Sequence, residues 1–235
     1  MRILITRPAE DGAEIAQLLT AMGHEAVLAP LLAPRWFDGP PLELDGVAAI
    51  LATSANGIRA LIRRTTRRDL PVFAVGPQTT SEAKAAGFAC VKNADGDAVA
   101  LAQAVPRWIA PDAGALLHVC GEDTVGNLAT VLGAQGYAVR RAVLYAVDPQ
   151  PLPPSALQAL RDGAVDAALF FSPRSARIFR DAVAGIPLEG VTAFCISPAT
   201  ATALAGLDFV EIRAAARPNQ AALLALVPDQ MEKRH

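Results

Sequence analysis

The sequence predicts an α/β protein built from two domains with parallel sheets. Short apolar runs alternate with longer amphipathic segments, which is the pattern of strands connected by helices. Segments of the first half recur in the second half, which indicates an internal duplication. The chain has 235 residues, of which 52% are hydrophobic and 19% charged, so it can form one large domain or two small ones with a sizeable core.

The composition excludes several classes of protein. High hydrophobicity with a net charge of −2 excludes intrinsic disorder, which needs the opposite balance. The 18 Pro and 17 Gly spread along the chain exclude a coiled coil. An isoelectric point near 5.9 disfavours a general nucleic-acid binder, so no nucleic-acid partner is expected.

The cysteines and the apolar runs bear on the compartment in which the protein works. Cys90, Cys120 and Cys195 lack metal-type spacing, and their odd number and wide separation disfavour a disulfide framework. No apolar run reaches the roughly 18 residues of a membrane span. The opening Met-Arg leads directly into a strand-like run and not into a signal peptide. We therefore expect a cytoplasmic protein without membrane contact.

Ten short apolar runs predict strands, and the alternation favours parallel sheets covered by helices on both faces. The predicted strands are Arg2–Thr6, Ala26–Leu28, Val47–Thr53, Val72–Val75, Ala89–Lys92, Ala115–Cys120, Ala138–Tyr145, Asp166–Phe171, Val191–Ile196 and Phe209–Ile212. The predicted helices include Ala9–Ala21, Ala55–Arg68, Thr79–Ala86 and Leu128–Ala134. Two proline-rich stretches, Leu31–Leu44 and Val147–Ser155, are predicted to be linkers or exposed connections.

The internal repeat orders the chain as A, B, A, B. An A unit at 1–36 recurs at 115–149, and a B unit at 47–105 recurs at 164–228. A tandem arrangement pairs each A with the B that follows it. Each proline-rich stretch separates an A from its following B, however, which favours a middle domain and an outer domain made of both chain ends. On that pairing the two doubly wound domains are 1–34 plus 150–230 and 40–143, with linkers at about 35–39 and 144–149.

The carboxyl ends of six predicted strands carry short segments of similar chemistry. These segments are TRP at 6–8, TSAN at 53–56, GPQT at 76–79, GED at 121–123, SPR at 172–174 and SPAT at 197–200. Ser, Thr and Pro are favoured at helix starts, where free backbone N–H groups attract anions. Ligands of open α/β sheets bind at this edge. Any one segment is more often an ordinary helix cap, but six together favour a shared site for an anionic ligand.

Other familiar constellations are missing from the sequence. It contains neither a G-x-x-x-x-G-K-[ST] phosphate loop nor a G-x-G-x-x-G after the first strand. His24, His118 and His235 are scattered, so a metal site or a Ser/His/Asp triad has little support. His118, inside an apolar strand, is predicted to be a core or edge residue. The pair Glu122-Asp123 is more typical of solvated charges at a helix start than of an acid pair.

Arginine outnumbers lysine by 18 to 3, a bias that suits bidentate carboxylate binding. One predicted helix carries Arg59, Arg63, Arg64, Arg67 and Arg68. A solvated outer face is the favoured interpretation of the last two. Arg7, Arg59 and Arg174 lie close to strand ends and are better candidates for ligand contacts. Tyr145, just before the second proline-rich stretch, is a candidate to face the ligand, with packing as an equal alternative.

The order and spacing of several segments identify a family. They are ILITRP with its following helix and Gly23, TSANG, VGPQT, CGE, Gly136 with Tyr145 after eight further residues, FFSPRS, and SPAT followed by ATAL. In these segments the chain resembles the uroporphyrinogen-III synthase family over about residues 1–228. The resemblance implies two Rossmann/flavodoxin-like parallel-sheet domains joined by a two-stranded β linker, which agrees with the second pairing above.

The resemblance also implies an activity, that of a lyase of heme and related tetrapyrrole biosynthesis. Such an enzyme takes hydroxymethylbilane, a linear tetrapyrrole with eight carboxylates, and cyclises it to uroporphyrinogen III with inversion of the last pyrrole ring. The implied route passes through an azafulvene cation and a spiro intermediate and uses no metal and no organic cofactor. The implied partners are this substrate and the preceding pathway enzyme that supplies it, and a monomer is expected.

Family residues carry over to this chain through their motifs. Tyr145 falls on the general acid proposed for the family, and Ser54, Thr79, Ser172 and Thr200 fall on residues thought to contact substrate. Together with the other strand-end candidates, the expected substrate-binding residues are Arg7, Ser54, Gly76, Thr79, Gly121, Ser172, Arg174, Ser197 and Thr200.

The chain departs from the family pattern at two places. An Arg-Gly pair with another Arg a few residues on is here Cys120-Gly121 followed by Val125 or Gly126, and the usual Gly of the last segment is Ser197. These departures leave open a non-catalytic two-domain binder of a small anionic ligand. A short nucleotide-sugar transferase is a third alternative, but it needs an acidic residue at a strand end, and none stands out. Tyr145 and the missing export signal favour the enzyme.

Overall fold

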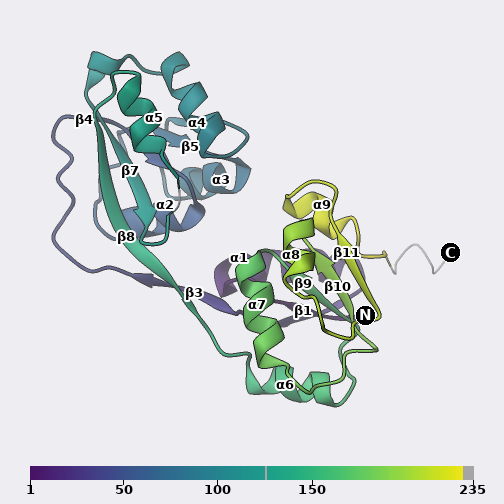
Figure 1. The fold of residues 1–235 in the computed structure, drawn as a ribbon. Helices are drawn as coiled ribbons and strands as arrows, with labels where there is room; N and C mark the ends of the chain where they lie inside the picture. Colours follow the sequence, from purple (N-terminus) through teal and green to yellow (C-terminus); the bar gives the residue numbers. More distant parts are fainter. Residues whose placement is uncertain (125, 230–235) are drawn as a thin grey trace. The chain divides into compact units, whose positions relative to one another are not determined.

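The computed structural model describes residues 1–124 and 126–229 (Figure 1). The chain divides into two compact units. Unit 1 comprises Met1–Ala33 and the chain from Asp148 onward, and unit 2 comprises Pro34–Val147. Each unit contains one sheet that is largely parallel, so the predicted α/β class is confirmed. Among the described helices, none combines the length and apolar character needed to cross a membrane.

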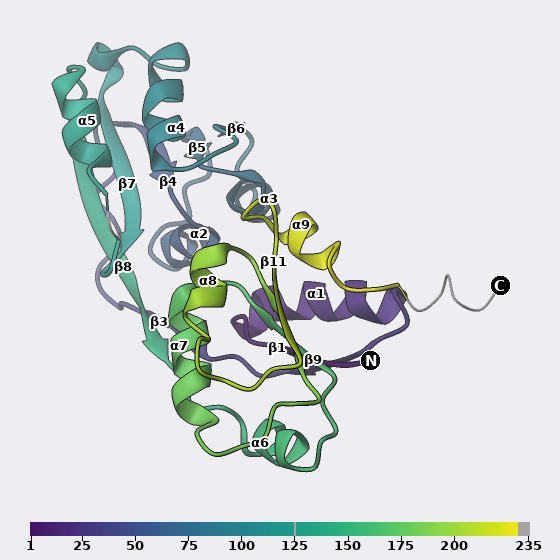
Figure 2. The same cartoon turned by 45° about the vertical axis from the view of Figure 1, so that its right-hand side comes forward.

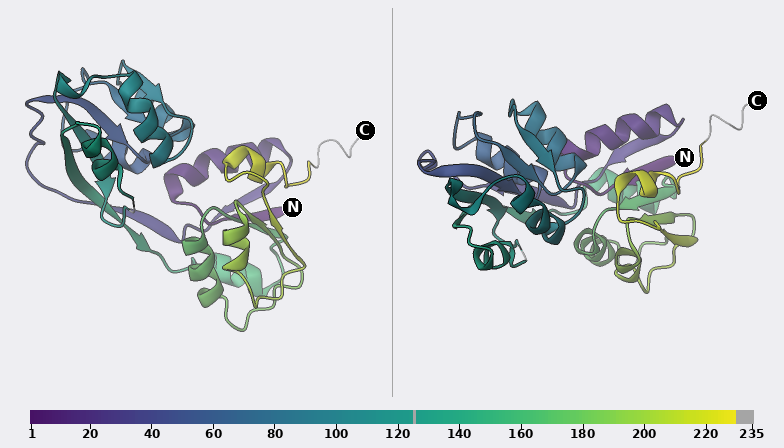
Figure 3. Two further views of the ribbon diagram at one scale, coloured as in Figure 1. Left: turned by 45° about the horizontal axis from the view of Figure 1, so that its top comes forward. Right: turned by 90° about the horizontal axis from the view of Figure 1, so that it is seen from above.

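Unit 1 is built from both ends of the chain. Its elements are β1 (Arg2–Ile5), α1 (Ala9–Ala21), β2 (Glu25–Leu28), α6 (Pro154–Arg161), β9 (Ala167–Phe170), α7 (Pro173–Ala182), β10 (Thr192–Cys195), α8 (Pro198–Thr202), β11 (Glu211–Ala214) and α9 (Gln220–Leu224). The sheet order is β11-β10-β9-β1-β2, and all its pairings are parallel. The N-terminal strand therefore lies between strands that are far from each other in sequence. Helix α9 lies beside α1, as the yellow and purple helices in Figure 3 show.

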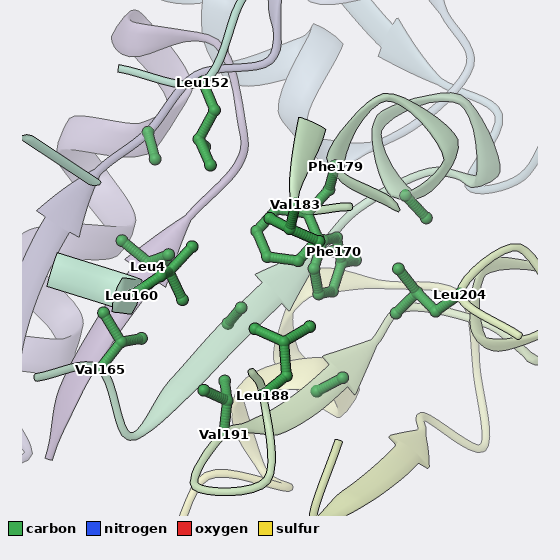
Figure 4. Close-up of a cluster of buried hydrophobic side chains, with 14 of the residues drawn as sticks. Leu4, Leu152, Leu160, Val165, Phe170, Phe179, Val183, Leu188, Val191 and Leu204 are labelled. Carbon is green, nitrogen blue, oxygen red and sulfur yellow. The ribbon is translucent and has the colours of Figure 1, made fainter. Parts of the chain in front are cut away.

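The apolar pattern of β1 explains why this sheet is covered on both faces. Leu4 packs on one face with Phe170, Phe179 and residues of α6 and α7, and Figure 4 shows the side chains of this cluster. Ile3 and Ile5 pack on the other face against α1 and α9, and Figure 2 shows α1 running along β1. Because side chains alternate along a strand, a continuous apolar run supplies both faces.

Unit 2 follows the same plan with one additional strand. Its elements are β3 (Leu32–Trp36), β4 (Val47–Ala52), α2 (Ala55–Ile62), β5 (Val72–Ala74), α3 (Pro77–Ala85), β6 (Val91–Asn93), α4 (Ala98–Ala104), β7 (Ala115–Gly121), α5 (Leu128–Ala134) and β8 (Val139–Pro149), with two single 3₁₀ turns at Val105–Arg107 and Pro111–Ala113. The first two residues of β3 and the last two of β8 belong to unit 1. The sheet order is β3-β8-β7-β4-β5-β6. From β8 to β6 the pairings are parallel, and apolar clusters cover the two faces.

The two proline-rich stretches contain the boundaries between the units, but their interpretation as exposed connections was wrong, because both include strand residues. Strand β3 occupies part of the first, and β8 continues to Pro149 at the start of the second. The Phe37 N–H donates to the Leu144 carbonyl, and the Gln150 N–H donates to the Leu31 carbonyl, so the two strands run antiparallel. A proline at 34 is tolerated because β3 is an edge strand, which needs fewer backbone donors.

The other predicted elements occur with small shifts. The last strand lies at Glu211–Ala214, two residues later than predicted. The prediction of one helix over Ala55–Arg68 was wrong, because α2 ends at Ile62. Beyond that end, the Arg64 guanidinium donates to the carbonyls of Phe37 and Pro40 and fixes the chain in a turn.

Candidate active site

The end of β4 places a serine at the start of α2. Ser54 has extended backbone angles and is the N-cap of the helix, and its hydroxyl accepts a hydrogen bond from the Gly57 N–H at 3.0 Å. A Cβ atom at Gly57 would lie 3.0 Å from the Val119 carbonyl. The glycine therefore lets this helix start pack closely on β7, which brings Ser54 to the carboxyl-end edge of the sheet.

Tyr145 reaches the same edge from β8. Its hydroxyl lies 2.7 Å from the Ser54 Oγ, although the two residues are far apart in the sequence. The ring lies over Gly121, where an added Cβ would be 2.9 Å from the tyrosine Cε2 and Cζ atoms. The side chain is only 7% exposed. Two of the predicted site residues, Ser54 and Gly121, are thus brought together around a third, Tyr145.

The surroundings of Tyr145 affect its proton. Burial raises the pKa of its hydroxyl, the hydrogen bond from Ser54 lowers it in part, and the nearby Cys120 raises it again. The net pKa lies above the ordinary value of about 10. Tyr145 is therefore protonated at neutral pH and can donate a proton to a bound group.

A second group of polar side chains lies along β7 and its neighbours. His118 is buried as predicted, and its Nε2 lies 3.3 Å from the Thr53 hydroxyl. Burial first, and then the Arg141 guanidinium, lower the pKa of His118 to about 4. The same guanidinium lies 3.7 Å from the sulfur of Cys120. His118 is therefore a neutral core residue at physiological pH.

The remaining strand-end candidates of unit 2 are Gly76 and Thr79. Gly76 is the N-cap of α3, whose first residue is Pro77. Thr79 is buried at 4% exposure, while the neighbouring Thr80 hydroxyl donates to the Gly76 carbonyl. Gly76 is only half-buried, so the backbone of this helix start is more open than the Thr79 side chain.

In unit 1 two serines cap helices at neighbouring strand ends. Ser172 caps α7 by accepting from the Ser175 N–H, and its hydroxyl lies 3.0 Å from the Ser175 hydroxyl. Ser197 caps α8 by accepting from the Thr200 N–H, with its hydroxyl 3.0 Å from the Thr200 hydroxyl. Thr200 is 0% exposed, so Ser197 is the hydroxyl of this pair that is open to a ligand.

The predicted arginines of unit 1 lie at the same edge of its sheet. The Arg7 guanidinium pairs with Asp11 at 3.2 Å, donates to the Gln220 side chain and lies 4.9 Å from the centroid of the Phe171 ring. It is thus held in place within unit 1. Arg174 is the second residue of α7, two positions after Ser172.

The arginine cluster of unit 2 makes contacts within that unit. Arg59 pairs with Glu82 at 2.7 Å and donates to Asn56, so its contacts include a carboxylate of the protein itself. Arg67 pairs with exposed Asp69, and Arg68 donates to the Ala86 carbonyl. The interpretation of these last two as a solvated face holds for Arg67 and is wrong for Arg68, whose guanidinium also lies over the Phe88 ring.

The sequence interpretation missed Trp36, whose ring lies 6.1 Å from that of Tyr145, centroid to centroid. Trp36 belongs to a stretch that proline content marked as a connection, and only the apolar residues around it signalled a strand. Glu122 and Asp123 are exposed, as their interpretation as loop charges predicts, and the Glu122 N–H donates to the Tyr145 carbonyl. His235 and Val125, both considered from the sequence, lie outside the described residues.

Comparison with known proteins gives consistent results. The family model for uroporphyrinogen-III synthase HemD matches residues 13–225. A uroporphyrinogen-III synthetase from Helicobacter pylori has a similar structure, with 20% identity and a TM-score of 0.65, over 96% of this chain and 98% of that one. A mutant uroporphyrinogen III synthase from the extremely thermophilic bacterium Thermus thermophilus has 19% identity and a TM-score of 0.50, with 100% of both chains covered.

A search of curated proteins gives no match. The two solved structures support the fold, and the family model covers most of the length of the chain. Together with the predicted motifs, this match shows that the chain belongs to the uroporphyrinogen-III synthase family, whose members are lyases of heme biosynthesis.

Proposed function

We propose that the chain converts hydroxymethylbilane to uroporphyrinogen III through the residues described above. The substrate hydroxyl leaves as water after accepting one proton, which gives the azafulvene cation. The last pyrrole ring attacks through its substituted carbon, and the spiro intermediate then fragments and closes with that ring inverted. The final ring loses one proton as it becomes aromatic again. The net change is the loss of one water molecule, as expected of a lyase.

The single observation that carries this proposal is the hydrogen bond between Tyr145 and Ser54. A protonated phenol lies at the strand-end edge, where it can donate to the leaving hydroxyl. Ser54 can return a hydrogen bond to the tyrosinate that forms and so stabilise it. The proton released at the end of the reaction restores the Tyr145 hydroxyl, so the acid is regenerated in each cycle.

The strand-end helix starts are proposed to bind the carboxylates of the substrate. The helix start after Gly76 offers backbone N–H groups, and Ser172 and Ser197 offer hydroxyls together with the backbone of α7 and α8. Arg7 and Arg174 add positive charge at the same edge of unit 1. Buried Thr79 and Thr200 contribute by supporting their helix starts and not by direct contact.

The main task of the proposed enzyme is to impose geometry. Hydroxymethylbilane closes spontaneously to the non-inverted isomer, so the bound substrate must hold its last ring with the substituted carbon facing the cation. Fixed contacts to several carboxylates achieve this orientation. Direct supply of the substrate by the preceding pathway enzyme, in the cytoplasm, would shorten the time available for spontaneous closure, and we include that partner in the proposal.

The proposal is tested by adding purified protein to freshly generated hydroxymethylbilane and separating the oxidised products by isomer. We expect the type III isomer to dominate, with the type I isomer alone in the protein-free control. Formation of only the type I isomer by folded protein would contradict the proposal. A tetrapyrrole that still bound in that case would favour the alternative of a non-catalytic binder of anionic ligands.

A further inference from the structure

Trp36 contacts both Tyr145 and the guanidinium of Arg63. It is the last residue of β3, and its ring is tilted by 56° against the Tyr145 ring. The Arg63 guanidinium lies 4.8 Å from the centroid of the indole ring. A guanidinium at this distance attracts the negative face of an indole and restricts its rotation. Trp36 is therefore held by a charged residue while it contacts the proposed acid.

The backbone next to Trp36 is fixed as well. The Phe37 N–H donates to the carbonyl of Leu144, the residue before Tyr145. The Phe37 carbonyl accepts from Arg64 at 3.0 Å. Adjacent residues at the end of α2 thus hold the tryptophan, one through its ring and one through the neighbouring backbone. The ring contact and these two hydrogen bonds together fix the position of Trp36 relative to β8.

The two ends of helix α2 contact the two aromatic residues, Tyr145 and Trp36. Its N-cap Ser54 bonds the Tyr145 hydroxyl, and its C-cap Arg63 contacts Trp36. The eight residues of α2 form a short rigid segment of about 12 Å between these contacts. The Tyr145 ring is consequently bounded by Gly121, by Trp36 and by the hydroxyl of Ser54.

We propose that Trp36, supported by Arg63, is a positioning residue that holds the Tyr145 ring over Gly121 with its hydroxyl on Ser54. The inference rests on the proposed function, because it gives a purpose to the fixed tyrosine. An acid must point at the leaving group with little freedom, and misplacement by about 1 Å costs as much as about 100-fold in rate. Trp36 also packs against the buried Tyr145 ring and so shields it from water.

The first test reads the tyrosine directly and needs no substrate. The chain has two tyrosines, so in a Tyr137→Phe background an ultraviolet titration reports Tyr145 alone. Adding Trp36→Ala should lower the pKa of Tyr145 toward its ordinary value of about 10, because water reaches the ring. Titratable groups near Tyr145 include Cys120 on β7, with Arg141 next to its sulfur, and Arg63 at the Trp36 indole. Trp108→Phe, which changes the other of the two tryptophans, should leave the titration unchanged.

The second test uses the reaction. Trp36→Ala should lower kcat for the type III product about 10-fold or more, with little change in KM. The alkaline limb of its pH profile should move to lower pH, in parallel with the lower pKa of Tyr145. Trp36→Phe retains an aromatic ring and should restore most of the rate. Arg63→Gln should show the same pattern more weakly, whereas Arg67→Gln, at an exposed ion pair, should behave as wild type.

The outcomes separate the two proposals. If Trp36→Ala folds and leaves both the Tyr145 titration and the pH profile unchanged, the positioning role is wrong, even if the rate falls. If Trp36→Ala does not fold, Arg63→Gln and Trp36→Phe decide by the same two readouts. If the wild-type protein forms no type III product, the proposed function fails, while the titration still shows whether Trp36 positions Tyr145.

Discussion

The duplicated helix caps of the two units differ in what their hydroxyls contact. Ser172 and Ser197 in unit 1 bond hydroxyls three residues along their own helices, at 3.0 Å in each case. Ser54 occupies the corresponding cap position in unit 2, and its hydroxyl bonds Tyr145 on another strand. All three serines accept from a backbone N–H at the helix start. The difference therefore lies in the second partner and not in the cap.

This difference suggests how a duplicated fold acquires a reactive edge in one copy. A local hydroxyl pair completes a helix start and presents a neutral, anion-binding surface. A cap joined to a buried phenol places a proton donor at the same position. On the proposed function, the caps of unit 1 serve binding alone, whereas unit 2 combines binding at the helix start after Gly76 with proton transfer at Tyr145.

The largest effect is expected from removing the phenol. Tyr145→Phe retains the ring over Gly121 but removes the donor, so the rate of type III formation should fall by about 100-fold or more, as is typical for a lost general acid. Tyr137→Phe removes the other tyrosine hydroxyl, which bonds the Ile109 carbonyl, and should retain the rate. Isomer analysis of the products measures both variants. An unchanged rate for Tyr145→Phe would remove it as the acid.

A smaller loss should follow from filling the space under the tyrosine ring. At Gly121 an added Cβ lies 2.9 Å from the ring, so Gly121→Ala must displace Tyr145 or strain β7. We expect about a 10-fold lower rate, with a stability cost of about 1–3 kcal/mol for overpacking. Gly133→Ala in α5 is the matched control, since nothing lies within 4 Å of its added Cβ. That variant should gain about 0.5–1 kcal/mol in unfolding free energy, and equal behaviour of the two would contradict the packing argument.

The sequence predicted the helices and strands of each unit better than it predicted the contacts between distant segments within a unit. The alternation of strands and helices and the repeated segments located the strand ends, and Ser54, Ser172 and Ser197 do cap helices there. These are local features, which depend on neighbouring residues and on the period of the pattern.

The contact between Ser54 and Tyr145 joins distant segments, and residue spacing alone contains no distance between them. The same limit explains two errors in unit 2. Proline content hid β3 and with it Trp36, because an edge strand tolerates proline. The interpretation of Arg68 as solvated failed because its guanidinium donates to the carbonyl of Ala86, which is the C-cap of α3 and lies far from Arg68 in the sequence. Tertiary contacts of this kind become visible only when the strands are assembled.

A titrating core residue offers a further contrast between the units. His118 aligns with Ile5 in the repeat, so only the strand of unit 2 carries a histidine at this position. Its pKa of about 4 in the folded chain lies below the ordinary value of 6.5, because of burial and Arg141. Above pH 6.5 the histidine is neutral in both states, and its stabilising effect is complete. As the pH falls from about 6.5 to about 4, His118 is protonated in the unfolded chain before it is protonated in the folded chain. The free energy of unfolding therefore decreases by about 1–3 kcal/mol.

Denaturant unfolding at neutral pH and near pH 4.5 measures this loss. His118→Gln should lose less stability over that interval than the wild type. Arg141→Gln should give an intermediate result, because it removes the second cause of the pKa shift and leaves burial in place. Identical pH dependence in the wild type and in His118→Gln would show that other groups control acid stability.

The smallest effects should come from removing the serine caps of the helices. These variants compare the roles of the two units most directly. Ser54→Ala and Ser172→Ala each remove a cap hydrogen bond, so each should lower the unfolding free energy by about 1 kcal/mol. Only Ser54→Ala also removes a bond that lowers the pKa of Tyr145, so its tyrosine titration should move upward. Its kinetic effect should fall on kcat, whereas Ser172→Ala should raise KM through weaker carboxylate binding. If both variants change KM alone, Ser54 is a binding residue like its counterpart, and the two units share one role at their strand ends.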